Sequence, residues 1–381
     1  MKCLVQPGDG ATPLIKGIQD AKRSVEIVIF RFNRSEIEKA LAAAVTRGIH
    51  VHALIASTNR GGMQNLRDLE MRLLAAGVTV SRTDNDLVRY HGKLMIVDRS
   101  VLFLLAFNFT WLDMERSRSF GVVTSNKKHV EEAAKLFDAD TKRQPYTAGS
   151  ATFIVSPVNA RRQITAFIRG AKKELLIYDP EVSDPAIVRV LEARARAGVT
   201  VRIIGKLKAK SDVLPAAKTL QMRLHTRSIV RDGSWGFVGS QSLRSLELDA
   251  RREVGIIFRD PKVVGRLAKT FEEDWEAKDQ AAAQPLSAGE TEQQEQASAA
   301  KVARKVAKAV AEDMPPVKPV FEVTLRELSG SAPEALLKDG TNLDHAEMEA
   351  TVKQAVKDAV RQVVHNFVEE ATEARSAGTK G

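Results

Sequence analysis

The amino-acid sequence predicts an α/β protein of two pseudo-symmetric lobes, each a mixed β-sheet flanked by helices, followed by a helical C-terminal tail. Three observations support this prediction. Residues 21–55 align with residues 171–205 without a gap. A short motif with a histidine and a cation also occurs once in each half. At about residue 279 the composition changes to a run of Ala, Gln and Glu with few apolar residues.

Each copy of the repeat has the pattern of a βαβ unit. A strand rich in Ile and Val is followed by a short connection and a helix, which ends at Gly48 in the first copy and at Gly198 in the second. Glycine in this position is typical of a helix C-terminus. A second β-rich run follows, VHALI or VRIIG. Strand, helix and strand in this order predict a sheet flanked by helices in each half.

The histidine motif is HGKLMIVD, beginning at His91, in the first half and HTRSIVRD, beginning at His225, in the second. A cation follows each histidine by two residues, Lys93 or Arg227. Side chains at i and i+2 of a strand point to the same face, so each imidazole should project beside its cation. The two motifs are closer together along the chain than the two repeats, and we place the extra residues of the first half in a loop around 57–65.

Both motifs end at a turn. Asp98 and Asp232 follow the strands, and the sequence RDGS is a strong hairpin signal. We expect both aspartates to anchor turns by hydrogen bonds rather than to transfer protons. The return strands should then bring Asn108 and Ser240 close to the histidine and the cation of their half.

The composition limits the classes of protein that fit. Cys3 is the only cysteine, which excludes an intrachain disulfide and a Cys-based metal site. The N-terminus has no apolar run typical of a secretory signal, and the longest apolar run, residues 101–107, is too short to span a bilayer. Residues 1–278 hold 46 Lys/Arg and 31 Asp/Glu, or +15, whereas residues 279–381 hold 12 and 17, or −5. We expect a cytoplasmic protein, at most peripheral on a membrane, that attracts phosphate-bearing polyanions.

Two histidines in different protonation states can perform phosphoryl transfer together. A neutral imidazole attacks the electrophile, and a protonated one gives its proton to the leaving group. Lys93 and Arg227 would stabilise the charge that builds on the phosphoryl group. Neither half contains all of these parts. We therefore expect one site at the interface of the two lobes, formed by His91 and His225 about a pseudo-twofold axis.

These residues resemble the paired HKD motifs of the phospholipase D superfamily, whose hallmark is His-x-Lys, four residues, Asp, six residues and Gly-Ser-x-Asn. The resemblance covers about residues 10–277. It implies a metal-independent phosphodiesterase without a cofactor, in which one histidine forms a phosphohistidine intermediate and the other acts as acid and then as base. The site residues that it implies are His91, Lys93, Asp98, Asn108, His225, Arg227, Asp232, Ser240 and Glu253.

Both motifs depart from the hallmark. Arg227 stands in place of lysine and Ser242 in place of the final asparagine, while the first motif has Leu105-Ala106 in place of Gly-Ser and keeps Asn108. Arginine preserves the charge, but its planar fork differs from the point charge of lysine. These departures leave open a catalytically weak phosphate- or polyanion-binding protein as the alternative to an active enzyme.

The superfamily also uses a downstream acidic residue to hold an imidazole. Glu253 follows His225 at the same spacing at which Ser119 follows His91. We therefore expect Glu253 to hydrogen-bond His225 and raise its pKa, and Ser119 to leave the pKa of His91 lower. On this ground we assign His91 as the nucleophile and His225 as the acid.

The tail has a separate organisation. A helix that begins at Asp344 and continues to about Ala374 carries an apolar stripe. Two interpretations stay open, namely that this helix docks on the lobes or that it mediates self-association. The predicted domains are a first lobe at 1–150, a second lobe at 151–278, a flexible linker at 279–300 and a helical region at 301–381.

The function that we favour is hydrolysis or transfer of a phosphodiester in the manner of phospholipase D. We expect this phosphodiester to belong to a phospholipid. A metal-independent nuclease of the same superfamily is the enzymatic alternative. Only 5% of the residues are aromatic, which disfavours single-strand binding by base stacking and favours the lipid.

Overall fold

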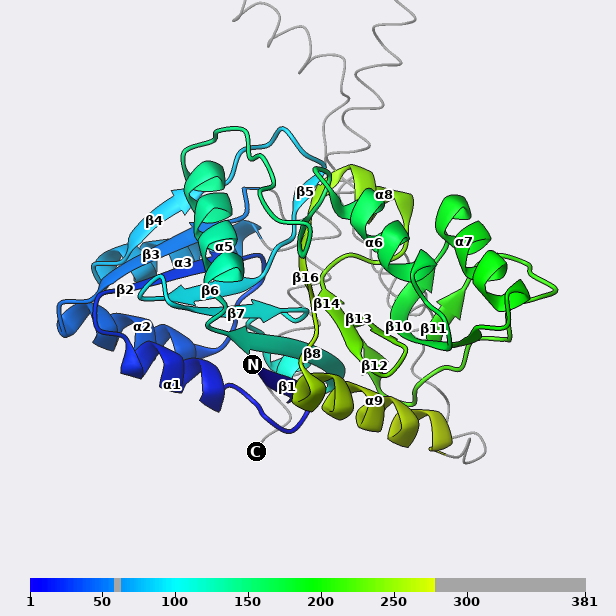
Figure 1. Cartoon of the computed structure of the whole chain (residues 1–381). Coiled ribbons are helices and arrows are strands. Elements are labelled where there is room, and N and C mark those ends of the chain that lie inside the picture. The colour runs from blue at the N-terminus through cyan, green and yellow to red at the C-terminus, as the bar shows by residue number, and fades with distance from the viewer. Residues whose placement is uncertain (58–62, 278–381) are drawn as a thin grey trace, which may run out of the picture. The chain divides into compact units, whose positions relative to one another are not determined.

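The computed structural model describes residues 1–57 and 63–277, which include both predicted lobes (Figure 1). The predicted linker (279–300) and helical region (301–381) lie outside the described residues, and so does the helix with the apolar stripe.

The two lobes contain sheets with the same strand order. The first sheet runs β1 (Lys2–Gln6), β8 (Ser117–Thr124), β7 (Val101–Leu105), β6 (Leu94–Val97), β2 (Ser24–Ile29), β3 (His50–Ile55) and β4 (Thr79–Arg82). The second runs β9 (Phe153–Val155), β16 (Val254–Phe258), β14 (Trp235–Gly239), β13 (Arg227–Arg231), β10 (Glu174–Val182) and β11 (Thr200–Leu207). Each strand of the second sheet thus takes the place of its counterpart in the first. Of the seven strands in this order only β4 has no counterpart, and β12 (Arg223–Leu224) joins the first sheet beside β8. Parallel pairs beside antiparallel ones make both sheets mixed, as predicted.

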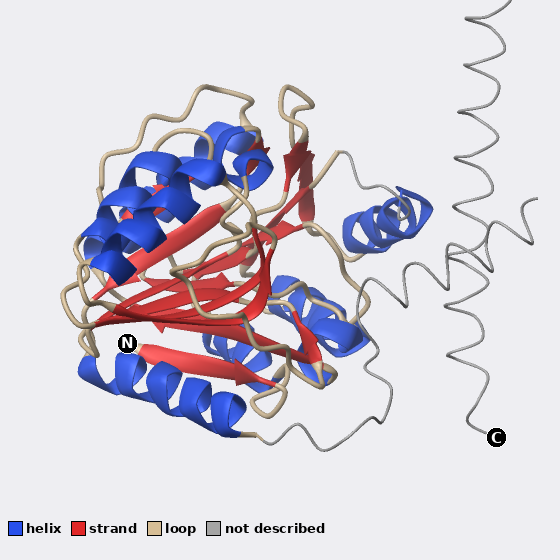
Figure 2. Cartoon of the chain, turned by 90° about the vertical axis from the view of Figure 1, so that its right-hand side faces the viewer, coloured by secondary structure: helices blue, strands red, loops and turns tan. Residues whose placement is uncertain are grey.

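The helices lie on both sides of the strands (Figure 2). One apolar core joins the outer helices to the first sheet, a second does so for the second sheet, and a third is shared by the strands of both sheets. The shared core makes the lobes one folding unit rather than two separable domains. The outer helices are α1 (Thr12–Asp20), α2 (Ser35–Thr46) and α3 (Met63–Ala75) on the first sheet, and α6 (Ala160–Arg169) and α7 (Pro185–Arg196) on the second. The shared core contains α5 (Lys127–Thr141) and α9 (Pro261–Glu276), and α4 (Trp111–Glu115) and α8 (Ser245–Asp249) are short.

The predicted duplication of the βαβ unit is confirmed residue by residue. Strands β2 and β10 begin at aligned residues of the two repeats, and so do helices α2 and α7. Ser24 pairs with His50 in the first lobe, and Glu174 pairs with Thr200 in the second, both in parallel register. The helices of both copies are followed by a glycine at φ +83°, a backbone conformation that L residues with a β-carbon rarely adopt.

We placed the extra length of the first half in a loop around residues 57–65, of which residues 58–62 lie outside the described residues. From Met63 on, the extra length forms helix α3 and the edge strand β4 instead of a loop. Leu66, Leu69 and Leu73 are buried under this helix at helical spacing, which explains why the segment folds against the sheet instead of looping out.

Both hairpins close at their aspartates, as predicted. Asp98 and Asp232 each have φ +52°, and the residue after each also has a positive φ, as a tight two-residue turn requires. The Asp98 carboxylate accepts hydrogen bonds from the backbone N–H groups of residues 22–24, and the Asp232 carboxylate does the same for residues 172–174. Both aspartates therefore tie the turn to the start of the neighbouring strand, at the end of the hairpin opposite to the histidines.

Replacing Asp232 by alanine should lower the free energy of unfolding by about 2 kcal/mol, because three backbone N–H groups lose a charged acceptor. Urea denaturation would measure the change. Asp232→Asn is the matched control, since asparagine tolerates a positive φ and keeps one acceptor oxygen. It should lose clearly less stability. Equal stability of the wild type and Asp232→Ala would contradict the anchoring role.

Candidate active site

Two short strand pairings cross from one lobe to the other beside the histidines. Strand β5 (Arg89–Tyr90) pairs with β15 (Arg251–Arg252), and strand β12 (Arg223–Leu224) pairs with β8. His91 directly follows β5, and its backbone N–H donates to the carbonyl of Arg252 at 2.7 Å. His225 directly follows β12, and its N–H donates to the carbonyl of Arg118 at 3.1 Å. The backbone of each histidine is thus fixed to the opposite lobe.

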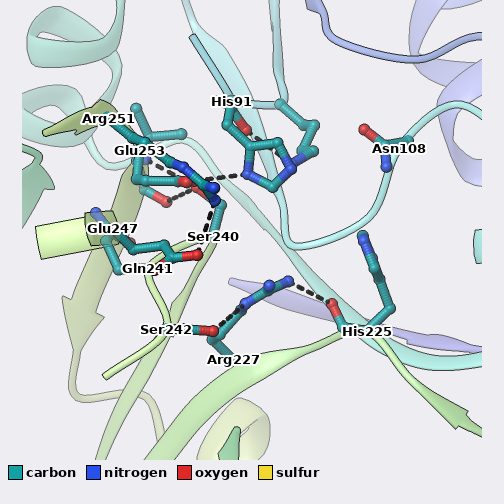
Figure 3. Close-up of polar contacts among 12 residues, drawn as sticks. His91, Asn108, His225, Arg227, Ser240, Gln241, Ser242, Glu247, Arg251 and Glu253 are labelled. Atoms are coloured by element: carbon teal, nitrogen blue, oxygen red, sulfur yellow. Dashed lines mark hydrogen bonds and ion pairs between the residues drawn. The ribbon is translucent and has the colours of Figure 1, made fainter. Parts of the chain in front are cut away.

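His91 lies between a carboxylate and an ammonium group (Figure 3). Its Nδ1 is 2.8 Å from Oε2 of Glu253, and its Nε2 is 2.8 Å from Nζ of Lys93. An ammonium group can only donate, so Nε2 accepts and Nδ1–H donates to Glu253. Lys93 and Glu253 are both fully buried. The arrangement fixes the tautomer that carries the lone pair on Nε2, and in the resting site this lone pair accepts the hydrogen bond from Lys93.

The predicted hydrogen bond between Glu253 and His225 is therefore wrong. Glu253 follows β15, which pairs with β5, so this carboxylate reaches the histidine of the other lobe. Ser119, on strand β8, holds the position of the first lobe that is equivalent to Glu253, and it follows Arg118, whose carbonyl accepts from the His225 N–H. Its hydroxyl is buried and has no hydrogen-bond partner among the described residues.

His225 has a different carboxylate partner, Asp113, which the sequence analysis missed. Its Nδ1 lies 3.3 Å from Oδ2 of Asp113, an ion-pair distance without the alignment of a hydrogen bond. Arg223 donates to the other oxygen of Asp113 at 2.6 Å. The backbone N–H and the side-chain amide of Asn108 donate to Oδ2 at 2.8 and 2.7 Å. A usable signal was present, because the equivalent position of the second half also holds a carboxylate, Glu247.

The two imidazoles differ in the charge beside them. Burial is the largest cause that lowers the pKa of both His91 and His225 well below the usual value. The next cause for His91 is the Lys93 cation, which lowers its pKa further. The next cause for His225 is the Asp113 carboxylate, which raises its pKa in opposition to burial. Asp113 thus opposes the effect of burial on the pKa of His225, whereas Lys93 adds to the effect of burial on the pKa of His91.

The carboxylates differ as well. Burial raises the pKa of Glu253, and the Lys93 cation opposes this shift. Burial would also raise the pKa of Asp113, but the charge that His225 carries when it is protonated, the charge of Arg223 and the hydrogen bond from the Asn108 N–H lower this pKa below its usual range. Asp113 consequently stays ionised.

The remaining predicted residues support the histidines. Nε of Arg227 donates to the Ser242 hydroxyl at 3.0 Å, and its Nη1 donates to the carbonyl of His225 at 3.1 Å. Ser242, which departs from the hallmark asparagine, thus holds the arginine that departs from the hallmark lysine. The Ser240 hydroxyl accepts from the Val254 N–H at 3.0 Å, donates to the Val254 carbonyl at 3.3 Å and acts to lower the pKa of Glu253. Ser240 and Asn108 therefore contact the carboxylates, while Asp98 and Asp232 lie away from the site.

The electrostatic interactions cross the boundary between the two lobes in both directions. We call this boundary, marked by the β5–β15 and β12–β8 pairings, the seam. Arg227 of the second lobe lowers the pKa of His91, and Lys93 of the first lobe lowers the pKa of His225. Figure 3 shows His91, His225 and Arg227 gathered in one region, with Glu253 beside His91 and Asn108 on the other side. The fold and this site define a class of two-lobed α/β proteins that carry one histidine from each lobe.

The comparison of families identifies the class more closely. The family described as "Cardiolipin synthase, PLD-like domain" matches residues 14–141 and 164–275, which together are more than half of the chain and include both lobes. The chain therefore belongs to this family of the phospholipase D superfamily.

Individual relatives are distant. Cardiolipin synthase A of Klebsiella pneumoniae is 22% identical over 326 residues, which cover 68% of this chain and 66% of that protein. The chain thus spans about two thirds of the length of this relative. The mitochondrial cardiolipin hydrolase of Canis lupus familiaris is 26% identical over 139 residues, which cover 36% of this chain and 53% of that protein.

Two solved structures share the fold. The polyphosphate kinase of Porphyromonas gingivalis superposes with a TM-score of 0.61 at 18% identity, over 75% of this chain and 53% of that one. The phosphatidylserine synthase of Haemophilus influenzae gives a TM-score of 0.56 at 10% identity, over 72% of this chain and 86% of that one. No helix among the described residues is long and apolar enough to cross a bilayer.

The protonation state of His91 can be tested directly. We expect His91 to be neutral at pH 7 as the Nδ1–H tautomer, and we expect Lys93→Met to raise its pKa, because the substitution removes a cation and keeps the apolar bulk. Nitrogen-15 NMR of histidine-labelled protein would measure both. His129, which bonds Thr152 outside the site, is the internal control and should not shift. A protonated His91 at pH 7 in the wild type would contradict the arrangement.

Proposed function

We propose that the protein is a phosphoric diester hydrolase or transferase of the phospholipase D type, and that its substrate is a phospholipid. The observation that carries the proposal is the pair of histidines held from opposite lobes in different electrostatic settings. Lys93 favours a neutral His91, and Asp113 favours a protonated His225. Double displacement at phosphorus needs a nucleophile and an acid of this kind.

In the first step, Nε2 of His91 attacks phosphorus, and the bond to the leaving alcohol breaks. His225 gives its proton to the leaving oxygen, so a phosphohistidine and a neutral imidazole remain. Lys93 and Arg227 stabilise the charge on the phosphoryl oxygens. Burial keeps His225 neutral in the free site, and the negative charge of the bound phosphodiester raises its pKa so that it can take up the proton.

In the second step, neutral His225 removes a proton from water or from an acceptor alcohol. The oxygen of this acceptor attacks phosphorus, the bond to His91 breaks, and both histidines return to their starting states. Hydrolysis and transfer differ only in the acceptor. The same residues therefore serve either outcome.

Two observations support a phospholipid as the substrate. The relatives at 22% and 26% identity carry the names cardiolipin synthase and cardiolipin hydrolase, and cardiolipin is a phospholipid. Residues 1–278 also carry +15, which favours an anionic lipid surface. A nucleic-acid substrate would also fit the positive charge of residues 1–278, but it would not fit the similarity to the two cardiolipin enzymes.

Incubation with labelled phosphatidylglycerol, phosphatidylcholine, and single- and double-stranded nucleic acid tests the proposed substrate. We expect turnover of a phospholipid, equal with and without EDTA, because Lys93 and Arg227 supply the positive charge at the phosphate. Catalytically inactive His91→Ala is the control for contaminating activity. Turnover of nucleic acid alone would identify a nuclease. Activity lost in EDTA and restored by magnesium or zinc would contradict the phosphohistidine mechanism.

The roles of the two histidines predict different trapping results. With a leaving group that needs no proton, such as p-nitrophenolate, His225→Ala should accumulate phosphate on His91, whereas His91→Ala should trap nothing. Mass spectrometry of quenched reactions would detect the adduct. Phosphate on His225 in the His91→Ala protein would reverse the assignment.

Asp113→Asn provides a graded version of the same test. Turnover of a natural ester should fall by about 10- to 100-fold, because His225 loses the carboxylate that favours its protonated form. Turnover of the p-nitrophenyl ester should change little. Equal losses on both substrates would show that Asp113 serves only the fold.

A further inference from the structure

Large apolar side chains are exposed on the segments that lead into the site. Val88 precedes His91 by three residues, and Met222 precedes His225 by three residues. Trp111 and Leu112 lie on α4, which also carries Asp113, and Leu246 lies on α8. Their exposed fractions range from 37% for Met222 to 61% for Val88. These five make up more than half of the large exposed apolar residues among the described part of the chain.

The exposed residues form two patches related by the duplication. Val88 and Met222 hold equivalent positions before the two histidine motifs, and Leu112 and Leu246 are separated by the same length of chain. In one patch the Val88 N–H donates to the carbonyl of Ala250 at 3.1 Å, and the Ala250 N–H donates to the carbonyl of Leu246 at 3.1 Å. Val88 and Leu246 are thus linked through the backbone of Ala250, next to the β5–β15 pairing that positions His91.

The other patch has the equivalent connections beside His225. Met222 leads into β12, which pairs with Ser117, the neighbour of Arg116. The Arg116 N–H donates to the carbonyl of Leu112 at 3.2 Å. Arg116 is exposed, and its guanidinium lies 5.2 Å from the centre of the Trp111 ring. We call the two patches, Val88 with Leu246 and Met222 with Trp111 and Leu112, the apolar rim.

We infer that the apolar rim is the surface by which the protein docks on an anionic phospholipid bilayer. Selection for solubility does not by itself explain exposed apolar side chains at duplicated positions on both sides of one site. A tryptophan stacked on an arginine suits the boundary between headgroups and acyl chains, where the ring is half immersed and the guanidinium contacts phosphate. The +15 charge of residues 1–278 is complementary to such a surface.

The inference rests on the proposed function for its substrate, because a site that draws phospholipid from a bilayer needs contact with the bilayer on both sides of its mouth. A second copy of the chain or its own residues 278–381 would cover the rim without serving the site. The bilayer is therefore the occupant that accounts for the position of both patches.

The test uses the full chain with His91→Ala, so that no lipid is consumed, and large vesicles of phosphatidylcholine with and without phosphatidylglycerol. Sedimentation should show binding to the anionic vesicles. The pairs Trp111→Ser with Leu112→Ser, and Val88→Ser with Leu246→Ser, should each weaken binding about tenfold or more. Met71 and Leu74 are exposed on α3, so Met71→Ser with Leu74→Ser is the matched control and should bind unchanged. Equal binding of the rim variants and the control would overturn the inference.

A second measurement separates this inference from the proposed function. With His91 restored, the rim variants should hydrolyse monomeric short-chain phosphatidylglycerol at the wild-type rate, which also shows that they fold. Vesicle binding that depends on the rim in a protein without lipid turnover would overturn the proposed function and keep the docking surface. Lipid turnover together with vesicle binding that is equal in the rim variants and the control would keep the proposed function and overturn the docking surface. Rim variants that convert an oligomer into a monomer, with vesicle binding unchanged, would assign the rim to a second copy of the chain and overturn docking.

Discussion

The site depends on two backbone hydrogen bonds that cross the seam, from His91 to the carbonyl of Arg252 and from His225 to the carbonyl of Arg118. Each histidine is placed by the opposite lobe, so neither half can form the site alone. The shared apolar core keeps the seam closed, because separating the lobes would expose side chains of both inner sheet faces to water. Closure also removes water from fully buried Lys93 and Glu253, which makes their charges act strongly on His91.

The duplication supplies a symmetric scaffold, and the chemistry comes from three pairs of equivalent positions that differ. The pairs are Thr110 and Arg244, Asp113 and Glu247, and Ser117 and Arg251. In the second lobe both arginines bind Glu247, so this carboxylate is neutralised by its own lobe. In the first lobe neither arginine is present, and Asp113 is reached instead by Arg223 and His225 from across the seam. Because the first lobe has no counterparts of Arg244 and Arg251, Asp113 is available to the His225 imidazole, whereas Glu247 is not. Glu253, which has only Ser119 as its counterpart, serves the other imidazole.

Local patterns predicted the elements, and the pairing between lobes could not be read from them. The glycines that end the helices and the aspartate turns each depend on a few consecutive residues, and the structure agrees with both. His91 does meet Lys93, but both precede strand β6 and do not lie on a strand as we predicted. The leucines at 66, 69 and 73 had helical spacing as well, and the Gly and Asn residues before them concealed it. The spacing of Glu253 from His225 along the chain fits a contact within a lobe and a contact across the seam equally well. Only the parallel pairing of β5 with β15 decides between the two.

The resting site favours an anionic substrate on electrostatic grounds. Burial lowers the pKa of both Lys93 and Arg227, which means that the folded protein holds these cations at a cost in solvation. It also keeps both imidazoles neutral and raises the pKa of Glu253. Each of these shifts would be opposed, for the cations and for His225, by one negative charge placed between the lobes. A phosphodiester carries such a charge at neutral pH. In the mechanism that we propose, its binding would stabilise the two cations and raise the pKa of His225, so that this histidine could protonate the leaving group. The desolvation that makes the empty site costly would then couple substrate binding to protonation of the proposed acid.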